Sequence, residues 1–306
     1  LFRVVELDDL NLGRYGIRLD SAASDTLRVE VRGDGSVARV LTEGGELVDN
    51  GSGTLELVSL QEDLEFRATV RSTGGNIAVE SQEGALLDGY LGQTNPPVTA
   101  FGELTLSAAD GARESGTESG RFDFRASSLS GNFSGGSAWL RTNASVAVSE
   151  GRALVASVDA VRLDLLLTGG TLAVSGQIQS VGSLLLQAMV GGVQMNHSNA
   201  EILSDGSLEI RSEETMSLAK VQSEGSLSLR SFAGRIDRAA GFVGASVLTT
   251  NSGIIPQLQS VGGMSITLDS ASSLAKVILP YTQASDYIVS AAAGSGGIIV
   301  LERSNV

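Results

Sequence analysis

Few residues in this chain could do chemistry: it contains one histidine and no cysteine. The histidine, His197, stands in the polar stretch Met195–Asn199. Zinc, haem and iron–sulfur sites draw mainly on His and Cys ligands, so none of them is expected. A Ser-His-Asp hydrolase typically carries its serine in a Gly-x-Ser-x-Gly turn between a strand and a helix, and none is found here. We therefore interpret His197 as a surface-loop histidine.

Carboxylates are the other candidates, because polysaccharide hydrolases of the parallel β-helix type use paired acids and the lyases use a base beside calcium. The chain has adjacent acids at Asp8-Asp9, Glu62-Asp63 and Glu213-Glu214. Adjacent residues of a strand point to opposite faces, so such pairs would not converge on a substrate. Aromatic residues that could stack on sugar rings make up only 4% of the chain. We predict no catalytic residues and no enzyme, with a carbohydrate-active β-helix enzyme kept as an alternative.

Calcium is the metal that the acidic residues could bind. Calcium-binding repeat turns use tandem Gly-Gly-x-Gly-x-Asp nonapeptides, and the sequence contains none. Scattered candidates remain at Asp8, Asp9 and Asp49. We predict no cofactor, and we leave calcium open as the ion of a calcium-stabilised surface-layer or biofilm matrix protein.

Several short motifs have a simpler explanation than function. Arg32-Gly33-Asp34 spells an integrin-recognition tripeptide, but it also suits the turn expected before a strand. Four Asn-x-Ser sequons are consistent with chance in a chain rich in Ser and Asn, namely Asn50, Asn132, Asn143 and Asn196. We assign no binding function to these motifs.

Two stretches interrupt the pattern of the chain and are candidate outward loops. One is Leu86–Ala100, which contains Tyr90 and the pair Pro96-Pro97, and the other is the polar run Ala108–Ser119. Loops on a rigid scaffold commonly carry binding residues. They are equally well interpreted as tolerated insertions.

Composition narrows the class of protein. The chain of 306 residues is 42% hydrophobic, with 38 glycines and only 4 prolines, which suits many tight turns around a narrow aliphatic core. Its net charge of −14 would repel nucleic acid. The longest apolar stretch, Val181–Met195, is broken by glycines and is too short to cross a bilayer, so no transmembrane segment is predicted.

The strongest signal is an internal repeat in which a glycine precedes a short alternating segment such as Gly206-Ser207-Leu208-Glu209-Ile210. The leading glycines recur every 19 residues, at Gly206, Gly225, Gly244 and Gly263, with Gly262 an alternative to the last. A second apolar mark follows nearly the same period, at Leu218, Ile236, Ile255 and Leu274. Looser copies begin at Gly53, Gly75, Gly102, Gly120, Gly170 and Gly182.

These repeats predict an all-β fold, a parallel β-solenoid of coils about 19 residues long. Alternation marks strands with one buried face, and each coil buries its apolar side chains against the next. We expect the glycines to supply positive φ at the corners, and a loop at Gly191–Asn199 to lengthen the step from Gly182 to Gly206. Residues 1–120 are predicted as an irregular β region, possible solenoid with inserted loops, and residues 121–306 as regular solenoid.

The segment Leu218–Leu229 resembles the repeats of filamentous-haemagglutinin-type adhesins, which are large bacterial surface proteins. The resemblance extends from Gly170 to Val277 and is general before that. It implies a right-handed parallel β-helix, secretion, and a structural stalk for adhesion or matrix assembly. It implies no catalytic residues.

Together these observations predict a non-enzymatic structural or adhesive fibre segment that is extracellular or on a cell surface. The expected partners are other copies of the chain, end to end, or the rest of a longer chain, with cell-surface or polysaccharide contacts besides. The chain lacks an initiator Met, so we expect it to be processed or a piece of something longer.

Overall fold

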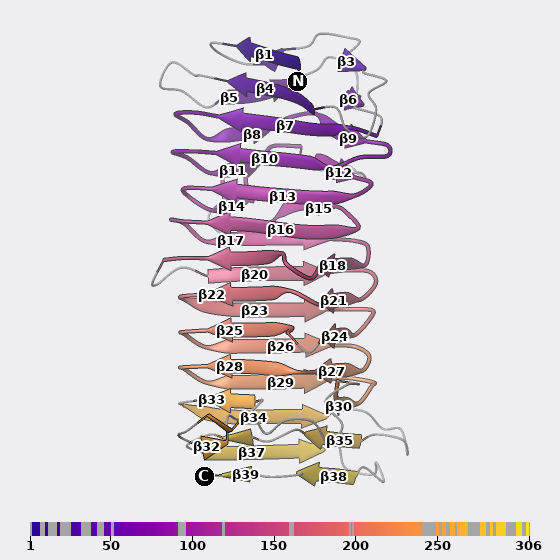
Figure 1. Cartoon of the computed structure of the whole chain (residues 1–306), viewed down its shortest axis with the longest axis vertical. Helices are drawn as coiled ribbons and strands as arrows, with labels where there is room; N and C mark the ends of the chain where they lie inside the picture. Colours follow the sequence, from indigo (N-terminus) through magenta and orange to yellow (C-terminus); the bar gives the residue numbers. More distant parts are fainter. Residues whose placement is uncertain are drawn as a thin grey trace. The chain divides into compact units, whose positions relative to one another are not determined.

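The protein is an all-β, parallel β-solenoid (Figure 1). A computed structural model of the whole chain describes residues 52–90, 96–117, 120–158, 162–195, 197, 199–239 and 262, together with the strands outside these ranges. This described part consists of strands and turns, without helices. Accordingly, it holds no helix with the length and apolar character needed to span a bilayer.

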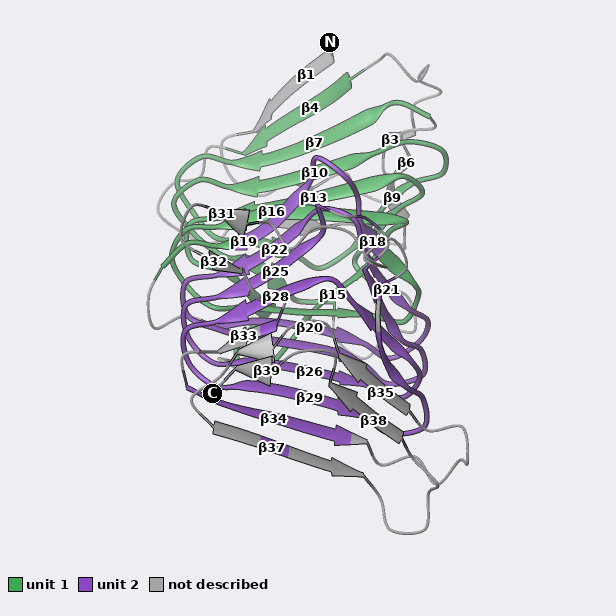
Figure 2. Ribbon diagram, turned by 60° about the horizontal axis from the view of Figure 1, so that its bottom comes forward, with its two compact units in different colours: residues 1–146, 156–161 green, residues 147–155, 162–306 purple. Residues whose placement is uncertain are grey.

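The chain forms two compact units, residues 1–146 with 156–161 and residues 147–155 with 162–306 (Figure 2). The strands β18 (Val146–Val148) and β19 (Ala153–Ala156) lie where the chain passes between them. In both units each coil contributes strands to three parallel ladders. The predicted boundary at residue 120 stays a prediction.

In the first unit, strands of successive coils pair in parallel, as β7, β10 and β13 do in Figure 1. The first ladder is β1 (Phe2–Glu6), β4 (Thr26–Val31), β7 (Thr54–Ser59), β10 (Ile77–Ser81), β13 (Glu103–Ala108) and β16 (Ser128–Phe133). The second is β2 (Leu10–Asn11), β5 (Ala38–Leu41), β8 (Leu64–Phe66), β11 (Leu86–Asp88), β14 (Ala112–Glu114) and β17 (Ala138–Thr142). The third is β3 (Ile17–Arg18), β6 (Glu46–Asp49), β9 (Thr69–Ser72), β12 (Val98–Ala100) and β15 (Phe122–Arg125), and it also ends on β17.

The second unit repeats this arrangement. Its first ladder is β20 (Arg162–Leu167), β23 (Ser183–Ala188), β26 (Leu208–Ser212), β29 (Leu227–Ser231), β34 (Gly263–Leu268) and β37 (Asp286–Ala291). Its second is β21 (Leu172–Val174), β24 (Val193–Met195), β27 (Met216–Leu218), β30 (Ile236–Arg238), β35 (Lys276–Leu279) and β38 (Ile298–Leu301). Its third is β22 (Gln177–Ser180), β25 (Glu201–Ser204), β28 (Lys220–Ser223), β33 (Leu258–Ser260), β36 (Thr282–Gln283) and β39 (Ser304–Asn305).

Within each unit, the strand register stacks residues of the same type from coil to coil. The apolar residues of the alternating segments form buried columns that run from coil to coil. One column of the first unit is Leu27, Leu55, Ile77, Leu104 and Leu129. One of the second unit is Leu163, Leu184, Leu208, Leu227 and Met264. Burying each such side chain contributes about 1.5–3 kcal/mol, so the columns supply the main stabilising term.

The leading glycines are needed for close approach, and the prediction that they all supply positive φ was wrong. Among the described residues, positive φ occurs at Gly111, Gly116, Gly151 and Gly170, of which only Gly170 leads a repeat. Gly225 instead stacks on Gly206, with its N–H donating to the Gly206 carbonyl at 3.0 Å. A Cβ on Gly225 would lie 2.9 Å from the Gly206 carbonyl and the Ser207 nitrogen. Backbones of adjacent coils are therefore too close at this corner for any side chain.

We expect Gly225→Ala to lower the free energy of unfolding by about 1–3 kcal/mol, the usual cost of overpacking, because the atoms in its way are backbone. Urea unfolding followed by far-UV circular dichroism measures the change. Exposed Ser226, the next residue, gives a matched control, and Ser226→Ala should stay within about 0.5 kcal/mol of the wild type. Equal stability of the two variants would contradict the close approach of the coils.

A buried serine two positions before the corner glycine completes the corner. Ser180, Ser204 and Ser223 are buried register partners in the third ladder of the second unit, and Ser260 takes the next register position. The Ser223 hydroxyl lies 2.8 Å from the Gly206 carbonyl of the preceding coil and 3.1 Å from the Ser226 carbonyl of its own turn. The Ser204 hydroxyl contacts the Gly182 carbonyl in the same way, at 2.8 Å. At Ser204 and Ser223 the motif Ser-x-Gly thus ties a corner to the one before it.

We expect Ser223→Ala to cost about 1 kcal/mol of stability, the net value of one buried hydrogen bond. Chemical denaturation measures it, again beside Ser226→Ala. A Ser223→Thr variant keeps the hydroxyl and should recover part of the loss if the hydrogen bond carries the effect. If Ser223→Ala did not lower the denaturation midpoint at all, the Ser223 hydroxyl would not contribute to the stability of the corner.

The predicted period of 19 is correct for one step and wrong for the next. Leu208 pairs with Leu227, but Leu227 pairs with Met264, and the Gly262 N–H donates to the Gly225 carbonyl at 3.0 Å. The copy at Gly244 therefore forms no coil between them. It falls in the connection from β30 to β33, which contains the antiparallel hairpin β31 (Thr249–Thr250) and β32 (Gly253–Ile254). Its sequence has Phe242 where the corner requires a small buried serine.

Two further details of the repeat differ from the prediction. Ile236 pairs with Met216, whereas Leu218 pairs with Arg238. The second series of apolar residues in the repeat, which began with Leu218 and Ile236, is therefore not stacked in register. Ile255 and Leu274, the rest of that series, lie outside the described residues. The predicted loop at Gly191–Asn199 contains β24, which stacks between β21 and β27, so most of the added length lies in the turn after Met195.

The copies at Gly120 and Gly170 show that the same short pattern builds more than one face of a coil. Phe122, after Gly120, pairs with Leu140 in the third ladder of the first unit. Leu172, after Gly170, pairs with Val193 in the second ladder of the second unit. The copies at Gly53, Gly75 and Gly102, by contrast, follow one another in a single ladder. Similar sequence therefore indicates a short strand after a turn, without specifying its ladder.

Candidate functional site

His197 lies in a turn of the second unit and is about one-third exposed, as expected of a loop histidine. Its Nδ1 accepts the Asn199 N–H at 3.2 Å, and its Nε2 is 3.5 Å from Glu150 Oε1. With Nδ1 accepting, a neutral ring carries its proton on Nε2, facing Glu150. These contacts are those of a histidine in a turn.

Two of the three adjacent acid pairs occupy corners, and for these two the prediction that they sit in strands was wrong. Glu62 and Asp63 lie in the turn between β7 and β8, where the Glu62 carbonyl accepts the Ser81 hydroxyl at 2.6 Å. Asp63 Oδ1 accepts the Ala85 N–H at 2.7 Å. Glu213-Glu214 lies in the turn after β26, and its backbone joins neighbouring coils. These contacts hold corners together.

The other candidates are scattered. Asp8, Asp9, Asn50, Asn196 and the Arg32-Gly33-Asp34 tripeptide lie outside the described residues. Asp49 is in β6, Asn132 is on β16 with its Oδ1 accepting the Ser157 hydroxyl at 3.0 Å, and Asn143 is exposed. In the part of the chain that the structure describes, no group of three His, Asp or Glu residues is placed to hold a metal ion.

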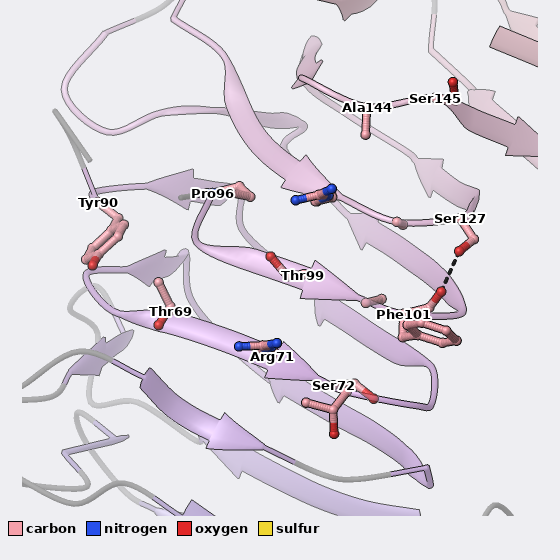
Figure 3. Close-up of a pocket in the computed structure, with 14 residues that line it drawn as sticks. Thr69, Arg71, Ser72, Tyr90, Pro96, Thr99, Phe101, Ser127, Ala144 and Ser145 are labelled. Atoms are coloured by element: carbon pink, nitrogen blue, oxygen red, sulfur yellow. Dashed lines mark hydrogen bonds between the residues drawn. The ribbon is translucent and has the colours of Figure 1, made fainter. Parts of the chain in front are cut away.

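A groove of about 730 Å³ lies on the outer face of the third ladder in the first unit (Figure 3). Three strands, β9, β12 and β15, form its floor, and the turns that follow them extend it. Its described lining contains two arginines and two aromatics but neither Asp nor Glu. The remaining lining residues are small or hydroxyl-bearing, namely Thr69, Ser72, Thr73, Pro96, Thr99, Ala100, Ala126, Ser127, Ala144 and Ser145. In a chain of net charge −14, such a lining is unusual.

The two arginines belong to one row across the strands. Thr99 of β12 pairs with Arg71 of β9 on one side and with Arg125 of β15 on the other. Adjacent strands are about 4.8 Å apart, so the Cα atoms of the two arginines are roughly 10 Å apart. Both arginines are exposed, and they lie on the same face of the ladder as Thr99. Asp49 of β6 is the partner of Arg71 on the side away from Thr99.

The aromatic residues stand at opposite ends of the groove, and turns fix both (Figure 3). The Tyr90 N–H donates to Asp88 Oδ1 at 2.9 Å. The Phe101 carbonyl accepts the Ser127 hydroxyl, and its N–H donates to the Ser72 carbonyl at 3.2 Å. The Phe101 ring is 66% exposed although it is large and apolar. The backbone of each residue is therefore anchored, which keeps the two side chains at opposite ends of the groove.

Close to Tyr90, acids from successive coils converge, which no adjacent pair in the sequence indicated. Asp88 of β11 is the register partner of Glu114 of β14, and Asp88 Oδ2 accepts the Asp123 N–H at 3.1 Å. Asp123 forms two contacts of 2.5 and 2.6 Å with the Arg141 guanidinium. That hydrogen-bonded pair raises the pKa of Arg141.

Asp88 is the acid with the most altered titration. Its side chain is only 4% exposed, and burial raises the pKa of its carboxyl to about 6. The nearby charges of Asp123 and Glu114 also act to raise the pKa, while the N–H groups of Tyr90 and Asp123 act to lower it, and about 6 is the net value. Both carboxyl oxygens of Asp88 thus accept backbone N–H groups, and Asp88 is not among the residues lining the groove.

The sequence pointed to part of this site. The stretch Leu86–Ala100 was predicted to be an outward loop, but its two ends are the ladder strands β11 and β12. Tyr90 and Pro96, between these strands, do line the groove. Arg71 and Arg125 were missed, because nothing in their local sequence distinguishes them, and Thr99 was not singled out within its stretch. Their common row exists only once the register of three strands from three coils is known.

Comparison with known proteins finds no protein-family model, no curated protein and no solved structure that matches this chain. The fold alone therefore defines the class, which is the parallel β-solenoids.

Proposed function

We propose that this chain is a non-enzymatic structural and adhesive segment that acts outside the cell or on its surface. The observation that carries the proposal is the in-register stacking of parallel strands within each unit, with buried columns that continue from coil to coil. A coil of this kind is completed only by the next one, so the architecture extends by adding coils. Such stacking suits a stalk or a fibre, and end-to-end contact with another copy or with the rest of a longer chain.

The resemblance to filamentous-haemagglutinin-type repeats supports the same proposal. The Ser-x-Gly corners of β25, β28 and β33 fall within the region that resembles filamentous-haemagglutinin-type repeats. In this chain the corners explain that pattern physically, because buried serines and close-packed glycines are what stacked turns require. We propose an adhesin-like location and role on this basis, with polysaccharide or cell-surface contacts.

The alternative is a carbohydrate-active enzyme, and one observation favours it. A carboxyl with a pKa of about 6, as burial produces at Asp88, is suited to general acid catalysis near neutral pH. Against it, both Asp88 oxygens accept backbone N–H groups, and Asp123 is paired with Arg141. Asp88 and Asp123 are thus engaged in contacts that hold neighbouring segments of the fold together, which supports the non-enzymatic proposal.

The purified chain should bind to polysaccharide-coated beads or whole cells without shortening any polysaccharide, and should associate end to end. Electron microscopy and sedimentation measure association, and assays for new reducing ends or unsaturated uronates measure cleavage. Addition of a chelator tests the calcium-stabilised alternative, which expects loss of association. Cleavage by the wild type that Asp88→Asn abolishes would replace our proposal with the enzyme. A chain that stays monomeric and adheres to nothing would also overturn it.

A further inference from the structure

We propose that the groove over β9, β12 and β15 is a binding site for an acidic oligosaccharide. Arg71 and Arg125 would bind its carboxylate or sulfate groups, while Tyr90 and Phe101 would stack against sugar rings at the two ends (Figure 3). The inference does not depend on the structural role proposed above, because the groove lies within one unit and needs no assembly.

The charge of the groove lining indicates which class of ligand would bind. The chain has 35 acidic and 21 basic residues, yet the described lining of this groove holds two arginines and no carboxylate. A guanidinium binds carboxylate or sulfate oxygens through parallel N–H donors, which is stronger than a contact between neutral groups. The two cations are separated by one strand, so they match a ligand that repeats its acidic groups along its length.

The shape of the floor argues against a peptide. An extended peptide usually binds a sheet by adding a strand to a free edge. Here β9 is paired with β6 and β12, while β12 and β15 are paired with each other and β15 also with β17. A ligand must therefore lie across side chains, where rings and hydroxyls are offered. Nucleic acid is disfavoured by the overall negative charge.

The aromatic residues argue for sugar over a simple inorganic anion. Phe101 is 66% exposed, and its backbone is fixed by Ser127 and Ser72. Tyr90 is fixed through its N–H by buried Asp88. An exposed ring on an anchored backbone offers an apolar face at a defined place on the scaffold, which suits the apolar face of a pyranose. Thr99, between the arginines, offers a hydroxyl to the sugar hydroxyls.

The test uses the full chain and fluorescence anisotropy with three labelled probes: a galacturonate oligosaccharide, a heparin-derived oligosaccharide and a neutral malto-oligosaccharide. We expect an acidic probe to bind and the neutral one not to. The two acidic probes distinguish carboxylate from sulfate as the group that is bound. Arg125→Ala should raise the Kd about tenfold, the effect of one charged hydrogen-bonded contact, and Arg125→Lys should raise it less.

Arg230→Ala is the matched control, because Arg230 is an exposed strand arginine of β29 outside the groove. It should leave the Kd unchanged, whereas Tyr90→Ala and Phe101→Ala should each raise it severalfold. Equal loss in Arg230→Ala, equal binding of the neutral probe, or displacement by poly-glutamate as effective as by the acidic sugar would overturn the inference. Cleavage of a bound probe would leave this inference standing and overturn the non-enzymatic proposal instead.

Discussion

Phe122→Ala is expected to lower the free energy of unfolding of the first unit by about 3–5 kcal/mol. Phe122 is fully buried, and its ring meets that of Phe66 edge to face, with centroids 5.7 Å apart and planes at 78°. These two rings come from the second and third ladders of different coils. Truncation would leave a cavity between strands whose register is fixed on both sides, so collapse around it is limited.

The matched control is Phe101→Ala, since Phe101 is 66% exposed and should change stability by less than about 0.5 kcal/mol. Trp139, the only tryptophan, is in β17 of the first unit, so its fluorescence in urea reports on this unit. Similar midpoints for the two phenylalanine variants would show that Phe122 is not part of a packed core. A loss at Phe122 alone would locate the aromatic core between the ladders.

The class of fold was predictable because stacked coils leave a signature in the sequence itself. Apolar and polar residues alternate after each corner, as in Leu208-Glu209-Ile210 and Leu227-Ser228-Leu229, and this alternation indicates which side chains are buried. The leading glycine records where backbones of adjacent coils touch. Both are local requirements, so they appear at every coil and reveal the repeat.

The number and length of coils were less predictable, because the free energy of closing a connection rises only slowly with its length. The chain leaves the ladders after β30 and returns at β33. Gly244, between these strands, has a local sequence similar to that of the corner glycines. The serine before the corner distinguishes the two cases. Ser204 and Ser223 donate to carbonyls of the preceding coil, whereas Phe242 precedes Gly244. A search that required Ser-x-Gly would have omitted the false coil.

The site was the least predictable part. Residues of one coil are close in sequence, but the residues that form a site on a solenoid come from several coils. Arg71 and Arg125 are joined only through Thr99, and Asp88 and Glu114 only through the pairing of β11 with β14. Coil lengths in this unit vary, so no fixed spacing links such residues. The adjacent acids Glu62-Asp63 and Glu213-Glu214 therefore lie at corners, while the acids that converge are those in neighbouring strands.

Asp88 makes the pH dependence of stability a direct test of that convergence. Burial raises the pKa of this carboxyl to about 6 in the folded protein, above its ordinary value of 3.8. The folded state then binds the proton more tightly than the unfolded state, so protonation stabilises the fold. The contribution is fully present below about pH 4, is lost as the pH rises through 6, and amounts to about 3 kcal/mol.

We therefore expect Asp88→Asn, which cannot ionise, to gain stability relative to the wild type by about 3 kcal/mol as the pH rises from 3.5 to 7.5. The amide can still accept the Tyr90 N–H, but its NH₂ faces the Asp123 N–H, which adds a penalty that does not vary with pH. Urea unfolding of both proteins across this range measures the difference. Asp205→Asn, at an exposed corner, is the control for losing one charge. Parallel stability curves for wild type and Asp88→Asn would mean that Asp88 is solvated, and that the acids of neighbouring coils do not converge as the register implies.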